Sequence, residues 1–110
     1  MRRLLVAAAC AAFLSCRATP PPPAEGSPEA LGKAIFLQQC AICHNPDSLD
    51  KKMGPGLKSL FKRDKLSDGK PPSDATVRAR IDRGGTGMPP FSDMFSAPEM
   101  TALMAYLKTL

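Results

Sequence analysis

The segment Cys40-Ala41-Ile42-Cys43-His44 constrains this chain more than any other part of its sequence. Two thiols three residues apart lie on the same side of the backbone, because three residues are close to one helical turn. A histidine follows the second thiol directly. This C-x-x-C-H pattern is the signature of covalent c-type haem attachment, in which both sulfurs bond to the porphyrin and the imidazole of His44 faces the iron.

Two other interpretations of the motif are weaker. A structural zinc site needs four ligands from Cys and His. His44 is the only histidine, and the remaining cysteines, Cys10 and Cys16, lie in a leader-like segment. A thiol redox site of the C-x-x-C type expects alternating strands and helices, and the sequence contains no convincing strand run. The motif therefore predicts one covalently bound haem c.

Residues 1–16 are typical of an export signal. Arg2 and Arg3 precede an apolar run over residues 4–14, which is shorter than the roughly 20 residues that span a bilayer. The end of this run resembles the lipobox of bacterial lipoproteins, with Cys16 as the lipidated residue. We therefore expect a periplasmic protein anchored to the membrane through Cys16. Ordinary signal-peptidase cleavage, which leaves a freely soluble periplasmic protein, is the alternative.

A proline-rich segment, residues 17–27, separates the leader from the rest of the chain. It contains four consecutive prolines at positions 20–23, and such a composition favours extended polyproline II. A spacer is the expected role, and a ligand for a partner domain is the alternative. The folded unit is then a single domain over residues 28–110. A domain of this size has difficulty building a sufficient core by itself, and a buried haem supplies apolar surface.

Apolar periodicity predicts an all-α fold with three to four helices around the haem. The first helix spans about residues 28–39, capped by Ser27, with an apolar stripe of Leu31, Ile35 and Phe36. The second spans about 73–82 and ends at Gly84-Gly85. The third spans about 97–108, with an apolar face made of Met100, Leu103, Met104, Leu107 and Leu110. A short fourth helix is possible over residues 57–63.

Residues 29–110 resemble a class I cytochrome c, the small monohaem electron carrier. Gly32 and Phe36 match a pair that the family packs against its last helix, where Leu103 and Tyr106 match the facing residues. The match is physically reasonable, because a glycine lets two helices approach closely.

The resemblance also implies roles for residues after the motif. Gly54-Pro55-Gly56-Leu57 matches the G-P-x-L loop of the family, in which the proline carbonyl accepts a hydrogen bond from the proximal imidazole. That role falls on Pro55. Arg63 matches an arginine that the family places near a haem propionate.

The second axial ligand is expected to be a methionine, because the chain has a single histidine. Met100 and Met104 belong to an apolar helix face, and Met53 lies in the loop that leads to the proximal side. Met88 occupies an irregular segment, Gly87-Met88-Pro89-Pro90-Phe91, and matches the M-P-x-F ligand motif of the family. Met94 is the reserve candidate. The resemblance thus implies His44 and Met88 as iron ligands.

Histidine and methionine ligation indicates an electron carrier and not an enzyme. A thioether favours ferrous iron, and two filled axial positions leave little room for a substrate. The alternative is a gas-binding or sensing protein in which the methionine is displaced. Peroxidase-like catalysis needs an open iron and polar distal groups, to which nothing in the sequence points.

The charge pattern bears on the partners. The net charge is +5, or +3 when Arg2 and Arg3 leave with the leader. Seven cations are concentrated in one part of the domain: Lys51, Lys52, Lys58, Lys62, Arg63, Lys65 and Lys70. A basic rim steers encounters with acidic redox donors and acceptors, whereas the alternative is a merely solvated loop. Nucleic acid is not expected as a partner, because the chain has few aromatic residues to stack on bases.

Overall fold

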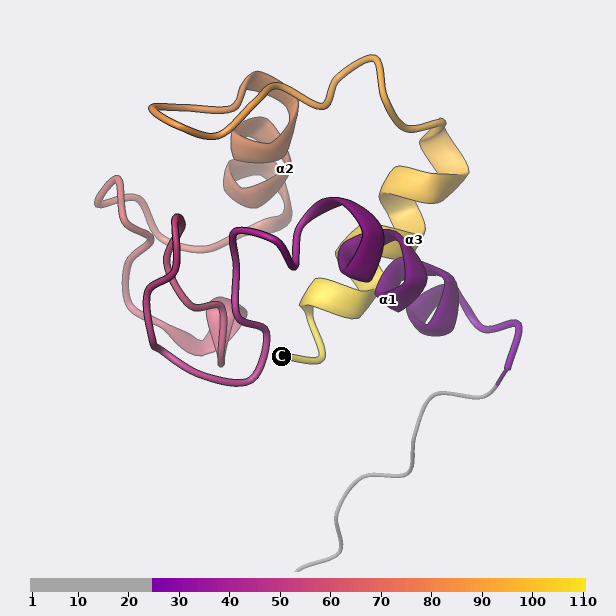
Figure 1. Cartoon of the computed structure of the whole chain (residues 1–110), viewed down its shortest axis with the longest axis horizontal. Coiled ribbons are helices and arrows are strands. Elements are labelled where there is room, and N and C mark those ends of the chain that lie inside the picture. The colour runs from indigo at the N-terminus through magenta and orange to yellow at the C-terminus, as the bar shows by residue number, and fades with distance from the viewer. Residues whose placement is uncertain (1–24) are drawn as a thin grey trace, which may run out of the picture.

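The computed structural model describes residues 25–110 and contains four helical elements (Figure 1). They are α1 (Pro28–Gln39), the 3₁₀ helix η1 (Leu60–Lys62), α2 (Asp74–Arg83) and α3 (Ala97–Leu107). Residues 25–110 form no β-strand, only an isolated bridge between Gly85 and Met88. The predicted all-α class is therefore confirmed. The predicted leader, its Cys16 and most of the spacer lie outside the described residues.

The three α-helices begin at serine caps. Ser27 accepts a hydrogen bond from the Ala30 amide at 3.1 Å. Ser73 and Ser96 each form a capping box, in which the side chain three residues later bonds back to the serine amide. Helix α2 ends at Gly84, where φ is +70°. These caps place the helix ends within one residue of the predicted boundaries.

Helices α1 and α3 form the only extensive helix–helix contact within residues 25–110. They cross at Gly32, where a Cβ atom would lie 2.6 Å from the carbonyl carbon of Ala102 and 2.8 Å from the Cβ of Tyr106. The rings of Phe36 and Tyr106 meet beside this crossing, with centroids 5.4 Å apart. Phe36 and Leu103 are fully buried. The expected packing of the first helix on the last is therefore confirmed.

One local prediction is met in a shorter form, and another needs correction. Of the possible short helix over residues 57–63, the structure forms the 3₁₀ helix η1, and Ser59 before it has φ of +57°. A left-handed residue at that position is incompatible with a continuous α-helix. Leu31 does not belong to the buried stripe of α1, because its side chain is 48% exposed and Gly32 takes its place against α3.

Helix α2 stands apart from the α1–α3 pair (Figure 1). The long loop that follows the C-x-x-C-H motif runs along one side of the intervening space, and residues 84–96 arch back from α2 to α3. Val77 and Ile81 of α2 are buried and line a cavity in this space. Within residues 25–110, no helix has the length and apolar character needed to cross a membrane.

Candidate haem site

A cavity of about 630 Å³ lies between the α1–α3 pair, α2 and the two long loops. This volume is in the range of cofactor pockets, roughly 300 to 1,000 Å³. Its apolar wall includes buried side chains from all three helices, namely Phe36, Val77, Ile81 and Leu107. Leu57, Leu60 and Phe91 from the loops and η1 complete that wall. The cavity therefore accepts a large, mainly apolar group at the centre of the domain.

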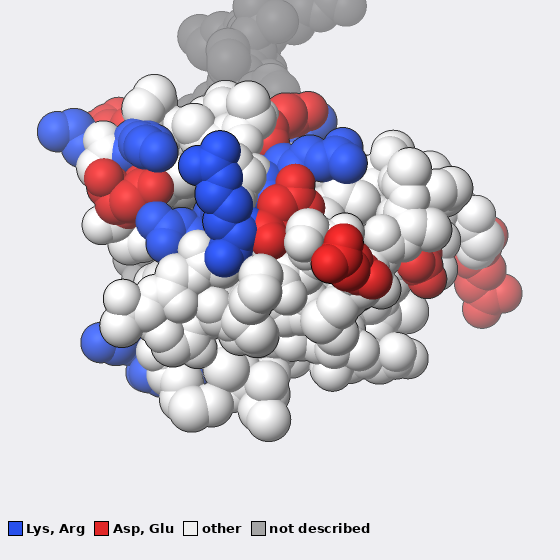
Figure 2. Space-filling view, turned by 90° about the horizontal axis from the view of Figure 1, so that it is seen from above, with Lys and Arg blue, Asp and Glu red and all other residues white. Residues whose placement is uncertain are grey.

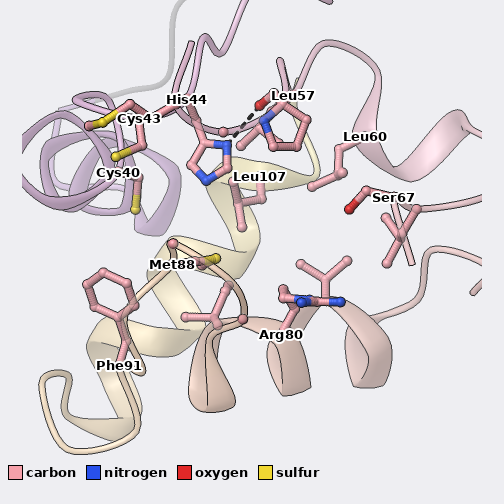
Figure 3. Close-up of a pocket in the computed structure, with 18 of the residues that line it drawn as sticks. Cys40, Cys43, His44, Leu57, Leu60, Ser67, Arg80, Met88, Phe91 and Leu107 are labelled. Atoms are coloured by element: carbon pink, nitrogen blue, oxygen red, sulfur yellow. Dashed lines mark hydrogen bonds between the residues drawn. The ribbon is translucent and has the colours of Figure 1, made fainter. Parts of the chain in front are cut away.

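Cys40 and Cys43 lie at the end of α1, on the wall of this cavity (Figure 3). Cys40 caps the helix, and its amide bonds to the Phe36 carbonyl at 2.8 Å. The chain then turns, with the Cys43 and His44 amides both bonded to the Cys40 carbonyl. Neither thiol is paired in a disulfide. Burial raises the pKa of the Cys40 thiol to about 11, and the nearby Cys43 contributes in the same direction.

The imidazole of His44 is held by the Gly54-Pro55 loop. Its Nδ1 lies 2.8 Å from the Pro55 carbonyl oxygen, which accepts a hydrogen bond when Nδ1 is protonated. This bond leaves Nε2 as the ring nitrogen available to a metal. The ring lies directly over Gly54, where a Cβ would come within 2.9 Å of Nδ1. The Gly54 amide also bonds to the Cys43 carbonyl at 2.8 Å, so the loop and the motif form one unit.

Met88 lies on the opposite wall from His44, and both side chains point into the cavity (Figure 3). Met88 lies at the end of a tight turn. Gly85 and Met88 exchange two backbone hydrogen bonds of 3.0 Å, and Gly87 has φ of +79°. Gly84 packs against this turn, where a Cβ would lie 2.8 Å from the carbonyl carbon of Pro89. The Phe91 amide bonds to the Ile81 carbonyl at 3.0 Å, which fastens the segment to the end of α2.

The other methionines of residues 25–110 are placed differently. Met100 and Met104 are buried in the core on α3. Met94 is 54% exposed and does not line the cavity. Met53 does line the cavity, but it precedes Gly54 in the loop beside His44 and is 72% exposed. Met88 is thus the methionine that faces His44 across the cavity.

Four cationic side chains reach the cavity wall: Lys51, Arg63, Lys65 and Arg80. Arg63 donates hydrogen bonds to the carbonyls of Gly56 and Lys58, with Nη2 distances of 2.7 and 2.6 Å. Arg63 therefore borders the cavity, and its guanidinium stabilises the loop that follows Pro55.

The sequence interpretation missed Arg80. This residue lies on α2 between Val77 and Ile81 and forms an ion pair with Asp68 at 3.0 Å. Arg80 follows Val77 by three positions, and residues three or four apart share a helix face. This spacing was the signal that could have placed Arg80 beside the cavity.

A protein-family model described as "Cytochrome C oxidase, cbb3-type, subunit III" matches residues 27–107. The chain belongs to this family of small c-type cytochromes. A search among curated proteins found none with significant similarity to this chain. The family match covers all three α-helices and both long loops, so it includes every wall of the cavity.

Membership in this family implies a covalently bound haem c, and the residues of this chain fit that group. The cavity has the size and the apolar wall for a macrocycle, with two unpaired thiols at its edge and an imidazole and a thioether on opposite walls. The family supports haem-based electron transfer, and its cytochrome c domains are typically electron carriers that are exported to the periplasm.

Proposed function

We propose that this cytochrome is a carrier of single electrons whose haem is attached at Cys40 and Cys43 and whose iron is ligated by His44 and Met88. The main support is that His44 and Met88 point into one cavity from opposite walls (Figure 3). A haem iron with these two ligands supplies reversible one-electron chemistry at a raised reduction potential, because a soft thioether favours the ferrous state.

The chain's own residues keep the site suited to this task. The Pro55 carbonyl orients the imidazole of His44 and raises its basicity as a ligand. The double hydrogen bond between Gly85 and Met88 holds the thioether in a defined turn. The apolar wall limits water at the site, which reduces the rearrangement that accompanies a change of charge. Arg63, Lys51 and Lys65 at the cavity wall are suited to the negative charge of the propionates, whereas Arg80 is paired with Asp68.

The test is replacement of the distal thioether. In Met88→Ala, we expect the oxidised protein to lose its weak long-wavelength charge-transfer band. The reduction potential should fall by on the order of 0.1 V, a fraction of the roughly 0.8 V over which axial ligands set haem potentials. Optical spectra and a potentiometric titration measure both effects.

Met94→Ala is the matched control, since Met94 is exposed and lies outside the cavity wall. It should leave the band and the potential unchanged. An unchanged band in Met88→Ala would refute the ligand assignment. Rapid binding of CO by the native reduced protein would favour gas sensing over electron transfer.

The proposed partners are redox proteins with acidic surfaces. Lys51 and Lys65 border the cavity together with Arg63 and Arg80, and the family description, that of an oxidase subunit, supports a redox enzyme as partner. On the face shown in Figure 2, Lys and Arg lie among Asp and Glu, so the attraction depends on the cavity border and not on a uniformly basic surface. The rate of electron exchange with an acidic partner should decrease as salt is added.

The proposed location is the periplasmic side of a membrane, with Cys16 carrying the lipid and residues 17–27 acting as the spacer. The leader composition supports this proposal. Intact mass measurement of the purified protein tests it, because acyl chains on Cys16 and a single haem each add a distinct mass. A mature chain that begins after Cys16 would overturn the anchor but not the electron-carrier function.

A further inference from the structure

We infer that Arg80 and Asp68 form a clamp that holds the Met88 turn against α2 and thereby sets how firmly the thioether stays on the iron. The inference rests on the proposed function, because it takes Met88 as the distal ligand. It concerns two residues for which the sequence suggested no role. The clamp acts through the backbone of Gly85, so Arg80 and Asp68 are positioning residues and touch neither iron nor substrate.

The first step of the contact chain is a turn that presents Asp68. The Gly69 amide bonds to the Leu66 carbonyl at 2.9 Å, and the Leu66 amide bonds to the Lys70 carbonyl at 2.7 Å. Asp68 Oδ1 accepts a hydrogen bond from the Lys70 amide at 3.1 Å, so the other carboxylate oxygen, Oδ2, is available to a second partner. The Lys70 amide and then the Arg80 side chain hold the pKa of Asp68 below its usual range.

The second step joins this turn to α2. Arg80 Nη2 donates to Asp68 Oδ2 at 3.0 Å, and the two side chains are 39% and 24% exposed. Residues 68 and 80 are twelve positions apart, so the pair fastens the loop before α2 to the second half of that helix. A pair with this partial shielding orients the guanidinium, although its own contribution to stability is small.

The third step is the contact between Arg80 and the turn that carries Met88. A Cβ placed on Gly85 would lie 3.5 Å from Cζ of Arg80 and closer still to Nη1, so the guanidinium covers the α-carbon of Gly85. Gly85 in turn exchanges both of its backbone hydrogen bonds with Met88. Arg80 and Met88 lie on the same side of the cavity, opposite His44 (Figure 3). Loss of the clamp therefore loosens the turn from one side, while the bond from the Phe91 amide to Ile81 still retains it.

Binding of imidazole to the oxidised holoprotein measures this effect, because exogenous imidazole must displace the thioether. Its apparent affinity rises with the fraction of molecules in which Met88 is detached. In Arg80→Gln and in Asp68→Asn, we expect about two- to fivefold tighter imidazole binding, the change that corresponds to loss of one partly exposed charged pair. The double variant should bind like either single variant, since both substitutions remove the same contact.

Arg78→Gln is the matched control. Arg78 lies on the same helix, pairs with Asp82 at 3.8 Å and does not line the cavity. It should leave the affinity for imidazole unchanged, although it removes the same charge. Gly85→Ala gives a second approach to the clamp, because the added Cβ displaces the guanidinium while Arg80 and Asp68 remain. It should reproduce the tighter binding if Arg80→Gln does not fold.

Two outcomes would overturn the clamp. One is native imidazole affinity in both Arg80→Gln and Asp68→Asn, whether or not their melting temperatures fall. The other is an equal rise in affinity in Arg78→Gln. Met88→Ala separates this failure from failure of the ligand assignment. Native protein that binds imidazole as tightly as Met88→Ala would refute Met88 as a ligand and the clamp together. Native protein that binds more weakly than Met88→Ala retains the assignment, whatever the Arg80 variants do.

Discussion

At the scale of single residues, the orientation of the His44 imidazole depends on the main-chain carbonyl of Pro55 and on the absence of a side chain at Gly54. The group beside Nδ1 of His44 is the carbonyl of Pro55, which a substitution at position 55 does not remove. Gly54 matters because it has no Cβ and so leaves room for the imidazole. A substitution at Gly54 should therefore disturb the imidazole more directly than a substitution at Pro55 does.

Gly54→Ala should displace the imidazole of His44. The new Cβ would lie 2.9 Å from Nδ1 and 3.0 Å from Nε2, so the ring must rotate or the loop must move away. We expect a free energy of unfolding lowered by about 1 to 3 kcal/mol, as for other overpacked sites. The reduced protein should also bind CO faster. Denaturant titration and CO-binding kinetics measure the two effects.

Gly26→Ala, before the start of α1, is the control for loss of a glycine with positive φ. Its Cβ would meet no atom within 4 Å, but its φ of +82° strains an alanine. That strain costs about 1 to 2 kcal/mol and should leave the haem spectrum and the CO kinetics as in the native protein. Equal CO kinetics in Gly54→Ala and native protein would contradict the role assigned to Gly54.

At the scale of elements, the crossing of α1 and α3 provides the frame on which the haem site is built. Gly32 permits the close approach, and Phe36 and Tyr106 pack beside it. Cys40 caps the end of α1, so the orientation of this helix sets where the two thiols lie. A change at the crossing therefore alters both stability and the geometry of the C-x-x-C-H motif.

Gly32→Ala should destabilise the domain by about 1 to 3 kcal/mol. The added Cβ meets the backbone carbonyl of Ala102, which cannot move aside as a flexible side chain could. Lys33→Ala, at an exposed position of the same helix, should change stability by no more than about 0.5 kcal/mol. Denaturant unfolding of the two holoproteins compares them, and equal midpoints would contradict the tight crossing.

The start of α3 predicts a dependence of stability on pH. Glu99 Oε2 accepts the Ser96 amide at 2.8 Å, and this bond, followed by one with the Ser96 side chain, lowers the pKa of Glu99. Because the folded pKa is the lower one, the ionised carboxylate stabilises the fold at neutral pH. That contribution is lost as pH falls below about 4.5, the ordinary value for a glutamate.

Glu99→Gln should therefore lose less stability between about pH 7 and pH 3.5 than the native protein does. Denaturant midpoints at the two pH values give the difference. A native dependence in Glu99→Gln would show that the capping box does not titrate in this range.

At the scale of the whole molecule, the cavity lies between α2 and the α1–α3 pair, at the edge of the apolar cluster that the three helices share. Val77 and Ile81 face the cavity, and α2 has no extensive contact with α1 or α3 within the described residues. A haem held in the cavity would give these side chains an apolar neighbour and would favour the folded position of α2 by burying apolar surface. Attachment of haem and docking of α2 are therefore coupled.

Haem-free protein, made as Cys40→Ser/Cys43→Ser, should lose the docking of α2. We expect the α2 amides to exchange with solvent almost as fast as in an unfolded chain, because local opening then costs little free energy. The amides of α1 and α3 should keep more protection, since these helices pack directly on each other. Hydrogen exchange of both forms measures this difference, and native protection of α2 without haem would contradict the coupling.

The sequence by itself determined the local features: the haem motif, the helix spans and the residues that cap them, because these depend on spacing and on neighbours in the chain. It also predicted the crossing at Gly32 and the candidate ligands, through a resemblance that covers the whole domain. It failed at Leu31, where the close approach of α3 to Gly32 outweighs apolar periodicity, and it did not predict that the short helix over 57–63 is reduced to one 3₁₀ turn.

Only the tertiary structure decided the contacts that neither spacing nor the resemblance supplied. It set Arg80 beside Asp68 and Gly85, and it separated Met53 and Met94 from the position facing His44. These relations join residues from different loops and helices, and no spacing along the chain encodes them. The physical reason is that α2 is positioned by the cavity and its two bordering loops and not by packing on another helix.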